Sequence, residues 1–302
     1  MTDSSNDTAP VPAGDDVKGT VSQRLGAGLS LGLIRLARLL PYHLRIRFGG
    51  WVFAKIVSPL AGHRKRILDN LSLVMPDLSD EERERIARAV PDNVGRTIFE
   101  LFSGDDFIRV ARNTPIEGEG LAALEQARAD GKAVILVSGH FGNYDVIRAG
   151  LIGRGFRMGS LYRPMSNPFF NKTYVETISH IGTPMFDQGR GGMASMVKFL
   201  RSGGALAILH DQRISSGEPV NFFGRPAMTG LSAAKLALKY NAIVIPFYAI
   251  RQADGLSFRI VSEAPIPEGS AHEMTQAIND SLEMQVRQHM DQWLWNHKRW
   301  KM

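Results

Sequence analysis

Cysteine is absent from the 302 residues of this chain. Its absence excludes a disulfide framework, a thiolate nucleophile and any cysteine-ligated metal or iron–sulfur site. The eight histidines form no H-x-H or H-x-x-x-H pair, the spacings at which two imidazoles share a metal ion. We therefore expect neither a metal ion nor a cofactor.

Acidic residues are missing from Val17 to Leu68, although the chain as a whole is only moderately basic, with a net charge of +6. The preceding leader carries four aspartates, so residues 69–302 sum to zero. Nucleic-acid binders usually spread basic residues over their recognition surface, and we expect no nucleic-acid partner here. Ten basic residues occupy the acid-free segment: Lys18, Arg24, Arg35, Arg38, Arg45, Arg47, Lys55, Arg64, Lys65 and Arg66.

A long hydrophobic run is also lacking, since the uncharged stretch Leu25–Ile34 is too short for the roughly 20 residues that span a bilayer. On a helix, five leucines (Leu25, Leu29, Leu33, Leu36 and Leu40) fall within an arc of about 80°. This pattern favours an amphipathic helix lying in the membrane surface. A helix packed on the protein body and a tilted spanning helix remain alternatives. Trp293, Trp295 and Trp300, with their basic neighbours, suggest a second patch at the headgroup layer.

Composition changes along the chain divide it into three parts. The leader is polar and rich in Pro and Gly, and we expect residues 1–18 to be a disordered tail. Residues 19–112 are expected to be a helical, basic, membrane-associated region, with Ser79 capping a helix whose first turn is acidic. Residues 113–302 are expected to form the catalytic domain.

That last part alternates short apolar runs with helical stretches. The runs expected to be strands are 133–138, 158–162, 205–209, 242–250 and 257–261, and the helices fall near 120–129, 143–153, 168–181, 191–202 and 229–240. Near-continuous apolar strands alternating with helices are typical of a mostly parallel central sheet covered by helices on both faces. We therefore predict an α/β fold.

Polar side chains follow four of these expected strands. In open parallel sheets, the chemistry collects beyond the carboxyl ends of the strands. We therefore expect His140, Arg163, Asp211 and Arg251 to converge on one rim. Asn167, Gln212 and Arg251 are candidates for substrate binding there, and Asp211 would either bind a sugar hydroxyl or hold an arginine.

His140 and Asp145 are the candidate catalytic pair. On a strand-to-helix turn they can meet, and a carboxylate on one imidazole nitrogen leaves the other free to take a proton. The chain has no G-x-S-x-G nucleophile pattern and no cysteine, so the nucleophile is expected to be a hydroxyl or amine of the substrate. The alternative is that His140 is a structural turn residue and Asp145 an acid at a helix start.

Five sequence elements in the same order resemble the bacterial lipid A biosynthesis late acyltransferases, the lauroyl/myristoyl transferase family. That family is similar to the glycerolphosphate acyltransferases in using an H-x4-D/E motif. The elements here are His140-x4-Asp145, Tyr162-Arg163-Pro164, Asp211-Gln212, the segment Phe222–Thr229 and the segment from Gln292 to Trp300.

The resemblance implies transfer of a fatty acyl chain from acyl–acyl carrier protein to a hydroxyl of a lipid A precursor, at the cytoplasmic face of the bacterial inner membrane. His140 would then be the general base, Asp145 its orienting acid, and Arg163 a residue for substrate or transition-state charge. Arg225 and Thr229 would join the substrate-binding set. The enzyme would be peripheral or held by a single N-terminal anchor.

Two other readings of the same residues remain. An acyltransferase of this superfamily could act on another glycolipid or phospholipid, for example a mannoside or an ornithine lipid. A non-catalytic membrane-binding module would use His140 and Asp145 only structurally.

Overall fold

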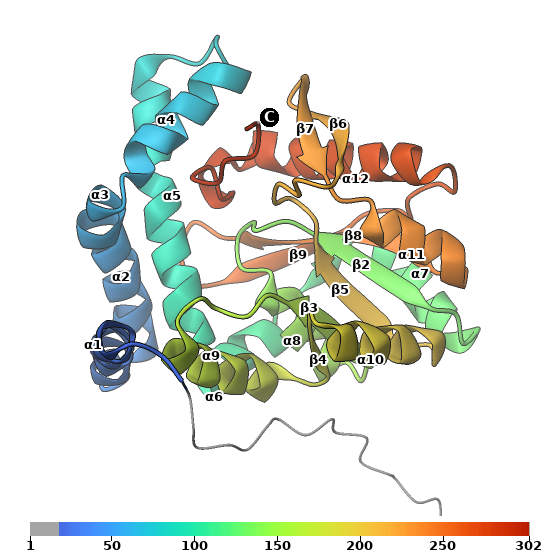
Figure 1. Ribbon diagram of the computed structural model, residues 1–302, viewed down its shortest axis with the longest axis horizontal. Coiled ribbons are helices and arrows are strands. Elements are labelled where there is room, and N and C mark those ends of the chain that lie inside the picture. Colours follow the sequence, from blue (N-terminus) through green and yellow to red (C-terminus); the bar gives the residue numbers. More distant parts are fainter. Residues whose placement is uncertain (1–17, 302) are drawn as a thin grey trace, which may run out of the picture.

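The computed structural model describes residues 18–301. The part of the chain up to Val17, where the tail is expected, lies outside these residues. Figure 1 shows a layer of helices beside an α/β body, with the long helix α5 between them.

The first layer consists of helices only, and its sequence signals explain where they begin. Thr20 caps the first helix in a reciprocal capping box with Gln23, and Ser79 caps α5, whose first turn holds three acids. The elements are α1 (Val21–Ala37), α2 (Tyr42–Val52), a π-helical stretch (Phe53–Val57), α3 (Ser58–Leu60), α4 (His63–Val74), α5 (Asp80–Leu101) and α6 (Asp105–Arg112).

The body is a seven-stranded sheet in the order β1-β9-β8-β2-β5-β3-β4. All neighbouring pairs are parallel except β8 with β9, which confirms the predicted mostly parallel α/β fold. Its strands are β1 (Ile116–Glu117), β2 (Val134–Ser138), β3 (Met158–Tyr162), β4 (Met185–Asp187), β5 (Ala205–Leu209), β8 (Ile243–Arg251) and β9 (Phe258–Ser262).

The remaining helices and a separate hairpin surround this sheet. The hairpin, β6 (Glu218–Phe222) with β7 (Arg225–Thr229), was not predicted, because Pro219 and Pro226 interrupt the apolar pattern of a strand. The helices are α7 (Glu119–Ala129), α8 (Asp145–Gly153), α9 (Pro168–Ile181), α10 (Arg190–Arg201), α11 (Ser232–Tyr240) and α12 (Ala271–Gln288), followed by a 3₁₀ turn (Met290–Gln292).

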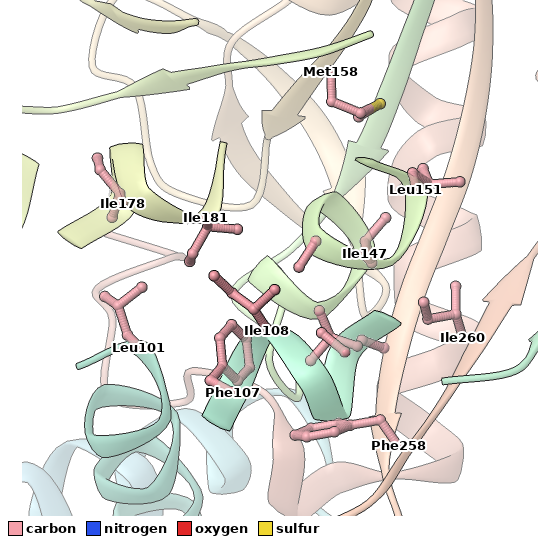
Figure 2. Packing of buried hydrophobic residues seen from close by; sticks show 14 of the residues in the cluster. Leu101, Phe107, Ile108, Ile147, Leu151, Met158, Ile178, Ile181, Phe258 and Ile260 are labelled. Carbon is pink, nitrogen blue, oxygen red and sulfur yellow. The ribbon is translucent and has the colours of Figure 1, made fainter. Parts of the chain in front are cut away.

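Both faces of the sheet are buried, as the alternation along β2 shows. Val134 and Leu136 pack into one hydrophobic cluster with α6, α7, α8 and α9, whereas Ile135 and Val137 pack into another with α10, α11 and α12. Figure 2 shows the first cluster, in which side chains of α5 and α6 meet those of α8, α9 and β9. The helical layer and the sheet therefore share one continuous core.

Helix α1 turns its leucine stripe outward. It contacts the body through Ala27, Leu31, Ile34 and Ala37, which are buried, whereas the four other leucines of the helix are exposed. Leu40, the fifth leucine of the predicted arc, lies beyond the end of α1. Three of the four exposed leucines of α1 are more than half exposed: Leu25 (69%), Leu29 (78%) and Leu36 (63%). The leucine stripe therefore does not serve the packing of α1 on the protein body.

Within residues 18–301, no helix combines the length and the apolar character needed to cross a bilayer.

The C-terminal tryptophans do not form the second headgroup patch that their sequence suggests. Trp293, Trp295 and Trp300 are 1%, 0% and 8% exposed, and they pack with Phe222 and Phe223 of the hairpin. Arg299 is buried beside them and donates to the Met228 carbonyl. Aromatic rings next to basic residues are typical of both an interface and a core, and here they are core.

Candidate active site

The turn after β2 presents His140. It is tightened by a hydrogen bond from Phe141 N–H to the Gly139 carbonyl (2.8 Å), and Gly142 adopts a positive φ of 54°. The C-terminal segment pairs with the turn, because Leu294 N–H donates to the His140 carbonyl (3.1 Å). These bonds fix the backbone from which the imidazole projects.

Asp211, at the end of neighbouring β5, holds that imidazole. Its Oδ1 lies 2.8 Å from His140 Nδ1, and its Oδ2 accepts from His140 N–H at 2.8 Å. Oδ2 also accepts from Trp293 Nε1 at 2.9 Å. The carboxylate is 2% exposed, whereas the His140 side chain is 23% exposed. A carboxylate at Nδ1 fixes the proton there, so Nε2 is the nitrogen left to accept a substrate proton.

Burial and the carboxylate act in opposite directions on the pKa of His140. Burial lowers this pKa, but the charge of Asp211 and its hydrogen bond raise it, and the net result is a pKa above the ordinary value. Burial raises the pKa of Asp211, but the charge and hydrogen bonds of His140 lower it by more. The pKa of Asp211 therefore lies below its ordinary value, and the carboxyl stays ionised. Each member of the pair therefore stabilises the charged form of the other.

Asp145 does not fill the role expected of it. Its Oδ1 accepts from Nε (3.2 Å) and Nη2 (2.9 Å) of Arg148, one turn further along α8. Arg148 also donates to the carbonyls of Ile178 (2.9 Å) and Gly182 (2.8 Å), so this buried pair ties α8 to the end of α9. The expected His140–Asp145 contact is therefore corrected to His140–Asp211.

The alternative that Asp211 holds an arginine is wrong, whereas contact with a sugar hydroxyl stays a prediction. Its hydrogen bonds go to His140 and Trp293, not to an arginine. The sequence analysis did not predict Trp293 as a hydrogen-bond partner of Asp211. Nothing in the sequence around Trp293 and Trp295 indicates which carboxylate an indole N–H would bind.

Two further predicted residues lie at the same rim. Gln212 Nε2 is 3.4 Å from His140 Nε2, the imidazole nitrogen that Asp211 does not bind. Arg163 follows β3, is exposed, and precedes Pro164, which restricts it to an extended backbone. The parallel register aligns Ser160 with Ala207 and Ala207 with Leu136, so β3, β5 and β2 end at the same level. Arg163 and His140 therefore both follow strands that end at this edge of the sheet.

The other four candidates make structural contacts. Asn167 caps α9 and donates from Nδ2 to the Gln23 carbonyl of α1 (2.7 Å). Arg225 donates to the Leu73 carbonyl (2.9 Å). Thr229 is fully buried and accepts from Arg299 (2.7 Å). Arg251 is 8% exposed and paired with Glu100. Substrate contact by Thr229 or Arg251 stays a prediction that their burial does not support.

In the described part of the chain, His, Asp and Glu residues do not gather in a group of three or more that could hold a metal ion. At the sheet edge, one nitrogen of a histidine is bound to a buried carboxylate and the other lies beside the Gln212 amide. This arrangement can perform general acid–base chemistry on a substrate hydroxyl. The fold and the site together define an α/β protein that carries a carboxylate-bound histidine at the carboxyl edge of its parallel sheet.

Comparison with known proteins shows the family to which the chain belongs. The model of the bacterial lipid A biosynthesis acyltransferase family matches residues 16–302, and the chain belongs to that family. It is 26% identical over 282 residues to a lipid A biosynthesis acyltransferase of Haemophilus influenzae, covering 90% of this chain and 86% of that one. Identity to the lipid A biosynthesis lauroyltransferase of Escherichia coli is 25% over 287 residues, with 90% of each chain covered.

A phosphatidylinositol mannoside acyltransferase of Mycobacterium tuberculosis is also similar, at 22% identity over 185 residues, or 60% of this chain and 58% of that one. This match is shorter than the matches to the lipid A enzymes.

Proposed function

We propose that this protein transfers a fatty acyl chain from acyl–acyl carrier protein to a hydroxyl of a lipid A precursor. The observation that carries the proposal is the His140–Asp211 pair at the edge of the sheet, with Nδ1 bound to the carboxylate and Nε2 contacted by the Gln212 amide. The family membership supports the reaction class, and the names of the relatives support the acceptor.

In the proposed reaction, His140 takes up one proton and later returns it. Nε2 of His140 removes the proton of the acceptor hydroxyl while its oxygen attacks the thioester carbonyl carbon. Asp211 stabilises the imidazolium that forms. When the tetrahedral intermediate collapses, the carbon–sulfur bond breaks and the imidazolium returns its proton to the leaving thiolate.

Arg163 is the proposed residue for an acceptor phosphate. Its guanidinium presents parallel donors that fit a phosphate in a bidentate fashion. The structure shows its position at the end of β3, and the exposed side chain is free to turn towards the rim.

The exposed leucines of α1 support attachment to the membrane surface. They lie on a helix with exposed Arg24, Arg35 and Arg38, and this combination suits the boundary between acyl chains and anionic headgroups. The loop after Arg163 is bound to α1 through Asn167 Nδ2 and the Gln23 carbonyl. A membrane that takes up α1 would thus lie next to the loop proposed to bind a lipid headgroup.

The proposal is tested by incubating the purified protein with acyl donors of several chain lengths, each on acyl carrier protein and on coenzyme A. The acceptors are a lipid A precursor, a phosphatidylinositol mannoside and an ornithine lipid, and products are read by mass spectrometry. We expect acylation of the lipid A precursor from the carrier protein donor. Acylation of another acceptor alone would overturn the acceptor, and preference for coenzyme A would overturn the donor.

A further inference from the structure

Helix α5 carries a buried carboxylate that the proposed chemistry does not use. Glu100 is 0% exposed, and its oxygens accept hydrogen bonds from both Nη atoms of Arg251 at the end of β8. Its Oε2 also accepts from Asn143 Nδ2 at 2.8 Å. Asn143 belongs to the turn that presents His140. The Glu100–Arg251 ion pair is therefore hydrogen-bonded directly to this turn.

Two more residues of α5 hold the same turn. Thr97 Oγ1 donates to the Gly142 carbonyl at 3.0 Å, and Asn93 Nδ2 approaches that carbonyl at 3.4 Å. Positions 93, 97 and 100 lie on one face of a helix. Arg251 organises them, because its Nε donates to Asn93 Oδ1 (2.7 Å) and its Nη2 to Thr97 Oγ1 (3.2 Å).

The turn is also enclosed from its other sides. A Cβ built on Gly142 would lie 1.8 Å from the Ala249 carbonyl oxygen of β8, which no side chain can tolerate. The N–H of Gly142 donates to the Gln292 carbonyl (2.9 Å), and the Gln292 side chain bonds to the Arg251 backbone in both directions. Residues 139–145 are therefore held by α5, β8 and the C-terminal segment together.

Burying an ion pair is costly, and apolar residues of similar volume often stabilise a protein as well or better. Apolar side chains in place of this buried network would therefore stabilise the folded protein about as well. The hydrogen bonds of the network instead hold the Gly142 carbonyl and the Asn143 side-chain amide, both in the turn that carries His140. Small displacements of this turn would affect proton transfer.

We propose that Asn93, Thr97, Glu100 and Arg251 are positioning residues, which clamp the turn so that His140 Nε2 meets the acceptor hydroxyl. This inference rests on the proposed role of His140 as the base. Arg251, considered above as a substrate ligand, acts through the turn and not on the substrate.

Thr97→Val is the sharpest test, since removing Glu100 or Arg251 would leave a buried charge unpaired and could unfold the protein. Valine keeps the shape of threonine and loses only the hydroxyl. Thr97→Ser restores the donor. Thr114→Val is the matched control, because it removes a threonine hydroxyl bond to the Val110 carbonyl (3.0 Å) outside the network.

Two readouts are measured for each variant: steady-state acyl transfer, and hydrogen–deuterium exchange of the peptide covering residues 139–145. In Thr97→Val we expect kcat to fall about ten- to a hundredfold with KM within about twofold, and exchange in this peptide to rise. Thr97→Ser should recover most of both, and Thr114→Val should change neither.

Unchanged exchange in Thr97→Val would show that no clamp exists. Faster exchange with an unchanged kcat would show that the clamp does not position the base. A failure of the proposed function is distinguishable from both, because the wild-type protein would then not acylate the lipid A precursor. A failure of the role of His140 as base would appear as full activity in His140→Ala, whatever the exchange in Thr97→Val.

Discussion

His140 can act as a base only while its imidazole is neutral, and Asp211 sets the pH at which that holds. The pKa of His140 lies above its ordinary value, because the carboxylate outweighs the effect of burial. Acyl transfer should therefore rise with pH through a value above about 6.5, the ordinary histidine pKa.

Asp211→Asn removes the charge and leaves burial, which lowers the pKa of His140. The acidic limb of the pH–rate profile should therefore move to lower pH, while kcat at its plateau falls at least about a hundredfold because the tautomer is no longer fixed. Asp145→Asn should leave the limb in place and instead lower the thermal midpoint, since Arg148 loses its buried partner. A limb that moves only in Asp145→Asn would contradict the assignment.

The two aspartates also show what spacing can and cannot predict. The turn after β2 and the placement of His140 on it follow from the apolar run and the glycines around it. The carboxylate partner of His140 does not follow from the sequence in this way. Arg148 lies three residues after Asp145 on the same helix and binds the Asp145 carboxylate. Asp211 becomes the partner only because β5 lies beside β2, and strand order is a tertiary property.

Helix α1 is apolar on two sides, because Ala27, Leu31, Ile34 and Ala37 face the protein and the other four leucines of the helix face outward. The sequence predicted the leucine arc itself. Which side of the helix the body would cover depends on how well Ala27 and Ala37 let α1 approach its neighbours, and this is decided by packing.

Replacing Leu25, Leu29 and Leu36 with Gln should weaken binding to anionic vesicles at least tenfold, because each leucine contributes about 1.5–3 kcal/mol when it leaves water. The thermal midpoint should change little, because exposed substitutions have small effects on stability. The control replaces Leu238 and Met284, also exposed, on α11 and α12. Equal sedimentation of both variants with wild type would exclude α1 as the membrane contact.

The whole molecule follows the predicted plan in its alternation of strands and helices, because burial on both faces makes parallel strands conspicuous. The hairpin β6–β7 and the buried C-terminal tryptophans were not predicted. The tryptophans pack in a core with α4, α5 and the hairpin, and the hairpin lies more than a hundred residues beyond the two helices in the sequence. Only the folded chain shows that they meet.

Global stability should depend on pH through His210, at the end of β5. Burial lowers the pKa of His210 to about 4, and Nδ1 is bound to the Ser138 carbonyl (2.9 Å). The unfolded chain binds a proton near pH 6.5 and the folded protein does not, so stability is present above that pH and is lost as pH falls towards 4.

At pH 5 this loss should amount to about 2 kcal/mol relative to pH 7, measured by urea unfolding. His210→Asn, whose amide can replace Nδ1 as donor to Ser138, should not show this component. An identical loss in wild type and variant would assign the acid sensitivity to other groups.

The most direct test of the account is the rate of acyl transfer to a lipid A precursor by His140→Ala, measured beside wild type at the pH optimum with thermal unfolding of both proteins. We expect a kcat lower by about two to four orders of magnitude, the share of a general base, in a variant that still folds and unfolds cooperatively. A folded His140→Ala protein that transfers acyl chains at nearly the wild-type rate would contradict it.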